Sequence, residues 1–290
     1  MFCSLFGYTK QAYYKCSTVS KHRVIKEQQA QESVLEIRRQ MPRIGTRKLH
    51  FMLKEKFKIS QIKVGRDKLF SLLRNSGLLI VKRKKYTVTT NSRHWMHKYP
   101  NLIKDLIVHR PEQLWVADIT YVEILDANGY LHLITDAYSK QVMGYELCND
   151  MEASSTLKAL KMALRSRKYP QQELIHHSDR GLQYCSKLYV NYLLKNNIGI
   201  SMTENGDPYE NAVAERMNGI LKDEFGLGEK LNDLHEALHQ TRQSINTYNH
   251  LRPHLSCQYL TPIQMHQQNK ITIKTWKKKT SKVASTSEVS

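Results

Sequence analysis

The hydrophobic pattern of this 290-residue chain changes its period once, near Glu112, and this change constrains the fold more than any other feature. Before it, apolar residues recur at helical spacing, as in Leu49, Leu53 and Phe57, whereas from Gln113 to Ile124 they alternate as in a strand. A single change of this kind predicts an all-α region followed by an α/β unit. The length agrees with two such parts, since domains of roughly 100–200 residues are common.

The order of its elements predicts the architecture of the α/β unit. Strand-like runs occupy residues 113–124, 130–138, 141–147, 173–178 and 198–202, and helical runs occupy residues 154–167, 186–196 and 208–225. Ser186 can cap the second of these helices. Three strands, then helix, strand, helix, strand and helix predict a mixed five-stranded sheet with flanking helices.

The first 98 residues are predicted to be helical, with helices near residues 9–15, 21–41, 46–57 and 63–75. Gly77 is a suitable end for the last of them. Two short helices joined by a tight connection, the second rich in Arg and Lys, are typical of a helix-turn-helix, here at about residues 44–80. The alternative is a small helical bundle with a charged surface.

Charge is distributed unevenly over the chain. Residues 1–117 hold 25 basic and 7 acidic side chains, residues 118–269 hold 14 and 18, and residues 270–290 hold 6 and 1. The basic arm predicts a polyanionic partner, either DNA or RNA. An acidic middle between basic flanks needs a reason of its own, and clustered carboxylates that bind metal would supply one.

Other features restrict the class of protein. Residues 82–104 form a basic linker, and residues 270–290 form a basic tail that is predicted to be disordered. The five cysteines form no CxxC pair, so they are expected to be ordinary reduced cysteines. The sequence has no signal-peptide pattern and no apolar stretch near the ~18–20 residues of a membrane span, so a cytoplasmic protein without a membrane partner is expected.

Two aspartates lie in strand-like segments. Asp118, within WVADITYV, would be costly to bury unless a cation or a solvent opening accompanies it; the alternative is an ion pair with a nearby Arg. Asp179 ends the segment ELIHHSD, and ligands of open α/β sheets favour the carboxyl ends of strands. Its alternative role is that of a turn-forming Asp shortly before a Gly.

Glu215 falls on the last predicted helix. Residues 207–210 (DPYE) form a strong helix start, and Gly226 is placed to end the helix. At ~100° per residue, the side opposite the apolar face carries a polar stripe made of Asn211, Glu215, Asn218 and Lys222. Glu215 therefore points away from the apolar face, with Lys222 two turns along. The alternative is an exposed Glu on a surface helix.

Taken together, the three carboxylates predict a metal site. Mg²⁺ is a hard cation that prefers carboxylate oxygens, and two such ions can serve both the attacking and the leaving oxygen in phosphoryl transfer. A zinc site is not favoured, because His176 and His177 point to opposite faces of a strand and no other residues have zinc-ligand spacing. Asp136, in another core strand, is interpreted as structural.

The segments around these carboxylates resemble the DDE catalytic core. Asp118 in WVADITYV, Asp179 in HHSDRGLQY and Glu215 in NGDPYENAVAERMNGILKDEF have its order, with 35 residues between the last two. The chain is similar to the integrase core shared by retroviral integrases and bacterial insertion-sequence transposases, in particular to the second-reading-frame product, often called OrfB, of a large insertion-sequence family. The resemblance covers about Phe6 to Met265, and IGTRKLHFMLKEKF…VGRDKLFSLLRNSGL resembles the helix-turn-helix that precedes this core.

The resemblance implies an RNase H-like fold and a DNA transposase that cleaves strands and then transfers them. It implies that Asp118, Asp179 and Glu215 are catalytic residues holding two Mg²⁺ ions, for which Mn²⁺ can substitute. The expected division is a DNA-binding region at 1–98, an integrase-type core at 105–269 and a tail at 270–290. The expected partners are transposon ends, target DNA, further copies of this chain, and the upstream-frame product as a fusion or partner. The expected location is the bacterial nucleoid.

Basic residues in and after the predicted helix-turn-helix are expected to contact DNA. They are Arg47, Lys48, Lys63, Arg66, Lys68, Arg74, Lys82, Arg83, Lys84 and Lys85, and Lys222 is expected to contact a phosphate near the carboxylates. Two other functions stay open on the residues alone: a nuclease of the same fold that only hydrolyses, and a non-catalytic DNA-binding regulator.

Overall fold

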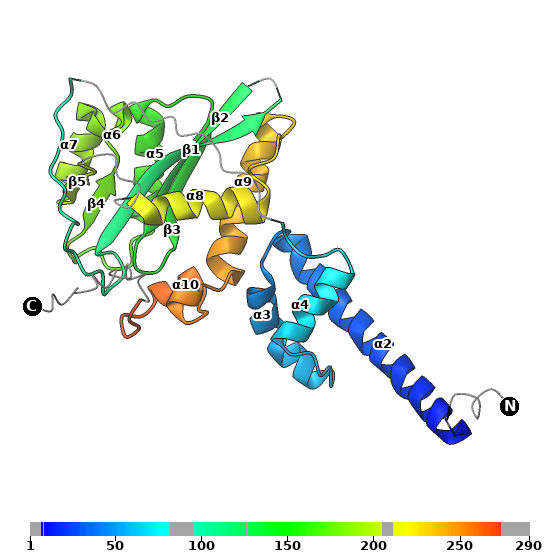
Figure 1. The fold of residues 1–290 in the computed structure, drawn as a ribbon. Coiled ribbons are helices and arrows are strands. Elements are labelled where there is room, and N and C mark those ends of the chain that lie inside the picture. Colours follow the sequence, from blue (N-terminus) through cyan, green and yellow to red (C-terminus); the bar gives the residue numbers. More distant parts are fainter. Residues whose placement is uncertain (1–6, 8, 82–94, 126, 205–210, 274–290) are drawn as a thin grey trace, which may run out of the picture.

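The computed structural model describes residues 7, 9–81, 95–125, 127–204 and 211–273. Helices α2 (Lys10–Gln40), α3 (Thr46–Ile59) and α4 (Arg66–Asn75) come first, and a sheet flanked by further helices follows (Figure 1). The change of period near Glu112 therefore separates an all-α region from an α/β unit, as predicted.

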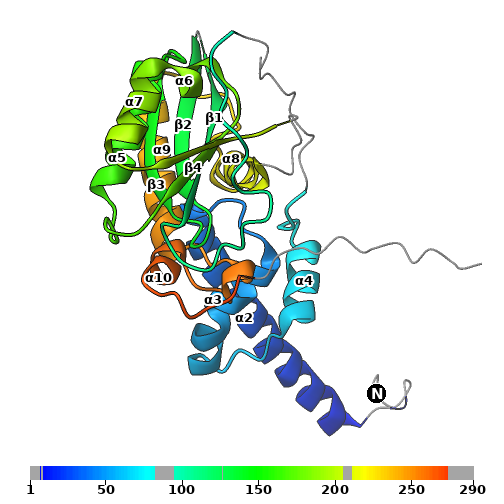
Figure 2. The same cartoon turned by 90° about the vertical axis from the view of Figure 1, so that its left-hand side faces the viewer.

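Helix α2 is continuous, whereas the sequence predicted a short helix and a longer one with a break between residues 15 and 21. That prediction was wrong. The residues STVS at 17–20 are poor helix formers, but neither Gly nor Pro interrupts residues 10–40, so the helix runs through. Its N-terminal part extends away from the rest of the molecule (Figures 1 and 2), and its C-terminal part buries Ala30 and Val34.

Helices α3 and α4 pack against each other around leucines at helical spacing. Leu49 and Leu53 of α3 and Leu69 and Leu73 of α4 are all buried. The connection between them covers residues 60–65, so α4 begins three residues later than predicted.

The sheet has five strands in the order β3-β2-β1-β4-β5. They are β1 (Leu114–Ile124), β2 (Ala127–Asp136), β3 (Val142–Cys148), β4 (Ile175–Ser178) and β5 (Gly199–Met202). β2 pairs antiparallel with β1 and β3, whereas β4 runs parallel to both β1 and β5, so the sheet is mixed, as predicted. The parallel pairing of β1 with β4 places the carboxyl end of β4 beside the middle of β1.

Helices cover both faces of the sheet, with α5 and α7 on one side and α8 on the other (Figure 2). The first side holds α5 (Ala153–Arg165), α6 (Leu182–Cys185) and α7 (Lys187–Lys195) around an apolar core that includes Trp115 and Ile134. Ser186 caps α7 by accepting a hydrogen bond from the Tyr189 backbone N–H, as its sequence predicted.

Helices α8 (Ala212–Phe225) and α9 (Leu234–Leu251) lie over the other face. Gly226 ends α8 in a left-handed conformation (φ 83°), as predicted, while the predicted start at 207–210 lies outside the described residues. Helix α9 was not predicted, because polar residues such as Thr241 and Ser244 share its buried face and interrupt the apolar stripe. A 3₁₀ turn, η2 (Leu255–Cys257), and α10 (Pro262–His266) follow.

The apolar core of α2–α4 is continuous with the core beneath α8 and α9. Val34, Leu49 and Leu69 belong to one cluster of buried residues with Ile220 and Tyr248. Helices α8 and α9 therefore share one core with the sheet and with the N-terminal helices. Among the helices that the structure describes, none combines the length and apolar character that a membrane span requires.

Candidate active site

Asp118 lies in the middle of β1, on the face that α8 covers. Its Oδ1 accepts a hydrogen bond from the Ile119 backbone N–H (2.9 Å), and its Oδ2 accepts one from Asn218 Nδ2 on α8 (2.7 Å). Burial raises the pKa of the Asp118 carboxyl to about 7, and the negative charges of Asp179 and Glu215 add to the rise. Asp118 is therefore a half-buried acid beside two further carboxylates, and the arrangement favours either a bound proton or a cation.

Asp179 comes directly after β4 and is level with Asp118. Val116 of β1 pairs with His177 of the parallel strand β4, so two residues further along each strand lie Asp118 and Asp179. Oδ1 of Asp179 accepts a hydrogen bond from the Gly181 backbone N–H (2.9 Å), which fixes the turn that leaves the strand. The predicted turn-forming role and a place beside Asp118 are thus compatible.

Glu215 lies in the first turn of α8 and is exposed. Two asparagines of the same helix hold α8 against β1: Asn211 Nδ2 donates to the Ala117 carbonyl oxygen (3.1 Å), and Asn218 donates to Asp118. The negative charge of Glu215 contributes to the raised pKa of Asp118, as does that of Asp179. The three predicted carboxylates are therefore near enough to interact electrostatically.

Lys222, two turns along α8, is half-buried close to this site. Burial lowers the pKa of its ammonium group, while the negative charge of Asp118 opposes that change. Its positive charge also opposes the rise in the pKa of Asp118. Lys222 is thus the cation that partly balances the three carboxylates.

Asn211 and Asn218 are site residues to which the sequence analysis assigned no role. Both belong to the predicted polar stripe of α8, and their spacing of seven residues places them on one side of the helix, which was the available signal. Both are buried, and the Oδ1 atom of each has no hydrogen-bond partner among the described residues. Two buried amide oxygens near three carboxylates leave acceptor capacity for a cation or its water shell.

The donor chemistry fits a hard divalent cation, since the site offers carboxylate and amide oxygens with an excess of negative charge. Within the described residues, however, no three His, Cys, Asp or Glu side chains converge closely enough to enclose an ion. The two histidines next to Asp179 turn to other partners: His176 hydrogen-bonds with Tyr189 and His177 with Ser201.

A second buried acidic group lies at the opposite end of β1 and is structural. Asp136 accepts hydrogen bonds from the backbone N–H groups of Glu112, Tyr138 and Ser139. The Glu112 carboxylate accepts from Arg167 Nε (2.9 Å) and from the Lys168 backbone N–H (2.6 Å). This network joins the start of β1 to the end of β2.

The basic residues that were predicted to contact DNA differ in the partners of their side chains. Arg47, Lys63 and Arg74 are exposed, and their side chains form no ion pair with any described residue. Lys68 pairs with Glu27, and Arg66 pairs with Asp67.

Lys48 stays a predicted contact, although its side chain is mostly buried and pairs with Glu224 of α8 (3.0 Å). The sequence could not show this, since 176 residues separate the two partners. The remaining predicted contacts, Lys82, Arg83, Lys84 and Lys85, lie outside the described residues.

A mixed sheet of this strand order, with carboxylates on β1, after β4 and on the helix that covers them, defines the RNase H-like fold. The integrase core domain family matches residues 108–208, and a second family of the same description matches residues 196–262. The catalytic unit is thus an integrase core, and integrase cores are polynucleotidyl transferases that depend on divalent metal ions.

Relatives that match two thirds or more of the chain define the family more closely. An uncharacterized 31 kDa protein of insertion element IS600 from Shigella sonnei is 35% identical over 267 residues, which cover 90% of this chain and 95% of that protein. The transposase for insertion sequence element IS629, also from Shigella sonnei, is 31% identical over 229 residues, covering 76% and 75%. Transposase InsF for insertion sequence IS3A from Escherichia coli strain K12 is 33% identical over 199 residues, covering 68% and 69%.

Among solved structures, the HTLV-2 integrase catalytic core domain in complex with magnesium aligns at 19% identity and a TM-score of 0.44, covering 54% of this chain and 97% of that one. The similarity to the three relatives carries the assignment: the chain belongs to the insertion-sequence transposases that contain an integrase core domain.

Proposed function

We propose that this chain cleaves DNA at the ends of an insertion sequence and joins the released ends to target DNA, with Asp118, Asp179 and Glu215 as its catalytic carboxylates. One observation carries the assignment of residues: the half-buried carboxyl of Asp118 lies on β1, partial burial raises its pKa to about 7, and Asp179 and Glu215 add their negative charge. Such an accumulation of like charge costs stability unless a cation binds there.

Two Mg²⁺ ions, for which Mn²⁺ can substitute, are the proposed cofactors, and the three carboxylates would hold them. When bound, such ions activate an attacking oxygen and stabilise a leaving one. The chain's own residues prepare the site. Asn218 fixes the orientation of Asp118 through its hydrogen bond, and Lys222 is placed to contact a DNA phosphate as a point charge.

The N-terminal region, residues 1–98, is the proposed DNA-binding part, and residues 105–269 form the proposed catalytic core. The chain is further proposed to act at the bacterial nucleoid as an oligomer of identical copies on transposon ends. An upstream-frame product is proposed to join it as a fusion or as a partner. The basic composition of this chain supports the DNA-binding part of the proposal, because phosphate contacts dominate the affinity of such proteins for DNA.

The test is the variant Glu215→Gln, which keeps the size of the side chain and removes its charge. Cleavage of a labelled transposon-end duplex in Mg²⁺ should fall below detection, while binding of the same duplex in a mobility-shift assay should be retained. Asp223→Asn is the matched control, since Asp223 is an exposed acid on the same helix. Undiminished cleavage by Glu215→Gln would refute the assignment.

The same assay separates the proposed transposase from the two other functions. Adding unlabelled target DNA yields joined products only if the chain transfers strands, whereas a nuclease yields cleaved ends alone. A DNA-binding regulator yields neither product at any concentration of Mg²⁺ or Mn²⁺. Running the assay with this chain alone and with the fused upstream product tests the proposed partner.

A further inference from the structure

The basic residues of the N-terminal helices differ in whether an acidic partner already neutralises them. Lys48, Lys56 and Lys68 each form an ion pair with a glutamate. In contrast, the side chains of Lys54 and Lys58 form neither an ion pair nor a hydrogen bond with any described residue. Their charges are therefore available to a ligand.

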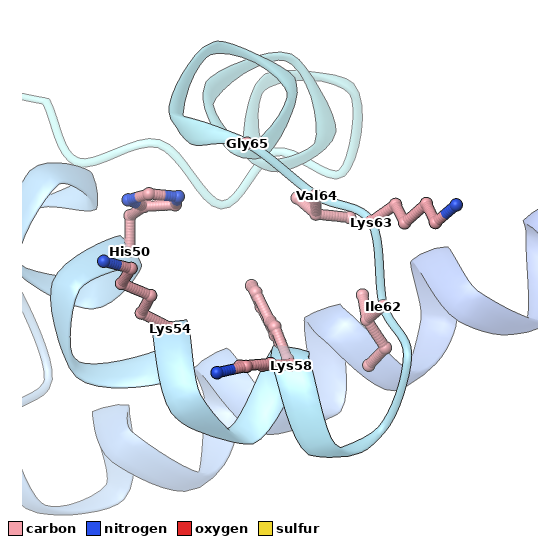
Figure 3. A pocket seen from close by; sticks show the side chains of 8 residues that line it. His50, Lys54, Lys58, Ile62, Lys63, Val64 and Gly65 are labelled. Atoms are coloured by element: carbon pink, nitrogen blue, oxygen red, sulfur yellow. The ribbon is translucent and has the colours of Figure 1, made fainter.

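These unpaired lysines line a hollow between α3 and the connection that leads to α4 (Figure 3). The hollow has a volume of ≈490 Å³. It is lined by His50, Lys54, Phe57, Lys58, Ile62, Lys63, Val64 and Gly65, with no acidic residue among them. A concave surface with several cations and no anion is complementary to a polyanion.

The positions of the cations follow from the helix. His50, Lys54 and Lys58 are spaced by four residues, so they form one stripe along α3 and occupy one side of the hollow in Figure 3. Phe57 and Ile62 are buried beneath, and Lys63 extends from the connection on the other side. Flexible lysines around an apolar floor suit the phosphates and sugars of a backbone rather than the edges of bases.

The first part of α3 ties this hollow to the catalytic unit. Lys48 pairs with Glu224 of α8, and the ring of Phe51 stacks on that of Tyr259 at 4.3 Å between centroids. A nucleic acid held at Lys54 and Lys58, one to two turns further along α3, is therefore held in a defined position relative to the helix that carries Glu215.

We propose that this hollow is a binding site for the DNA backbone, in which Lys54, Lys58 and Lys63 contact phosphates. The proposal rests on the proposed function and deepens it, because it assigns the main phosphate contacts to the outer face of α3. Of these three lysines, only Lys63 was among the contacts predicted from the sequence. Arg66 and Lys68 of α4 were also predicted, but their charges are already engaged by acidic partners.

The experiment compares two double variants that remove the same charge. Lys54→Ala/Lys58→Ala removes unpaired lysines from the hollow, whereas Lys56→Ala/Lys158→Ala removes lysines that are paired with Glu36 and Glu146. Fluorescence anisotropy would measure the affinity of each full-length variant for a transposon-end duplex over a range of salt concentrations. Thermal melting would confirm that each variant is folded.

The expected result is a change in the salt dependence of binding. Each phosphate contact contributes about 0.9 to the slope of log Kobs against log[salt], so the hollow variant should lose about 1.8 and the paired-lysine variant much less. The loss should be the same on a duplex of unrelated sequence, because phosphates carry no sequence information.

Three results would overturn the proposal. They are a wild-type slope for the hollow variant, equal losses for both variants, and a loss confined to the transposon-end sequence. None of them touches the proposed function, which fails separately if Glu215→Gln still cleaves. A wild-type slope for the hollow variant together with inactive Glu215→Gln would leave the transposase assignment standing and place the DNA elsewhere.

Discussion

The replacement of Glu224 by Ala tests the connection between the N-terminal helices and α8, the helix that carries Glu215. Glu224 accepts hydrogen bonds from Lys48 of α3 (3.0 Å) and from two nitrogens of Arg252 at the end of α9 (2.7 and 2.8 Å). Its backbone carbonyl oxygen also accepts the Arg43 N–H (3.1 Å). One carboxylate therefore compensates two cations that come from different parts of the chain.

The size of the expected effect follows from the burial of these partners. The side chain of Arg252 is 2% exposed, and its guanidinium group cannot lose its proton. Lys48 can lose its proton, since burial together with the positive charge of Arg252 lowers the pKa of its ammonium group to about 8. The uncompensated charge in Glu224→Ala is thus chiefly that of Arg252, and breaking a buried pair in this way costs about 3–5 kcal/mol.

Urea unfolding followed by circular dichroism measures this loss in the free energy of unfolding. Lys48→Met should cost less, because Glu224 keeps its bond to Arg252. Glu36→Ala is the control, since it removes an exposed ion pair with Lys56 and should change stability little. A loss below about 1 kcal/mol for Glu224→Ala would refute the view that this carboxylate compensates a buried charge.

Two further predictions concern the sheet. Burial alone would raise the pKa of the Glu112 carboxyl, but hydrogen bonds from His266 and Arg167 lower it to about 2 from an ordinary value of 4.5. The ionised carboxylate therefore stabilises the fold above pH 4.5, and this contribution is lost as the pH falls toward 2. Unfolding of Glu112→Gln should therefore be less pH-dependent than that of the natural chain over this window; equal slopes would contradict the assignment. Gly144→Ala places a Cβ 2.2 Å from a backbone oxygen of α5 and should destabilise the fold by about 1–3 kcal/mol. Gly219→Ala is the control, because its Cβ meets nothing within 4 Å inside a helix and should stabilise the fold slightly. Thermal melts measure both changes, and an unchanged melting temperature for Gly144→Ala would show that α5 can move away.

Local patterns in the sequence predicted much of the fold. Alternation identified β1, the Ser186 cap identified α7, and Gly226 marked the end of α8, because each signal lies within a few residues of the feature that it specifies. The predicted break in α2 failed because weak helix formers do not stop a helix that lacks Gly and Pro.

The candidate site was predictable in its residue types and less so in its contacts. The helical phase turned Glu215 away from the apolar face and placed Asn218 on the same stripe. The bond from Asn218 to Asp118 spans 100 residues, and no local pattern specifies it. For the same reason the sequence did not predict the ion pair between Lys48 and Glu224, which is recognisable only once the chain is folded.

The continuous core that α2–α4 share with α8 and α9 has a consequence for the order of events during synthesis on the ribosome. Helices α3 and α4 emerge early, yet the residues that complete their core, such as Ile220 and Tyr248, are made more than 140 residues later. Until then these helices expose apolar surface, and Lys48 has no counter-charge. Contacts of such long range are slow to form, so the nascent chain is vulnerable to proteases and aggregation for most of its translation. The N-terminal helices and the carboxylates therefore reach their final arrangement together, once nearly the whole chain has been made.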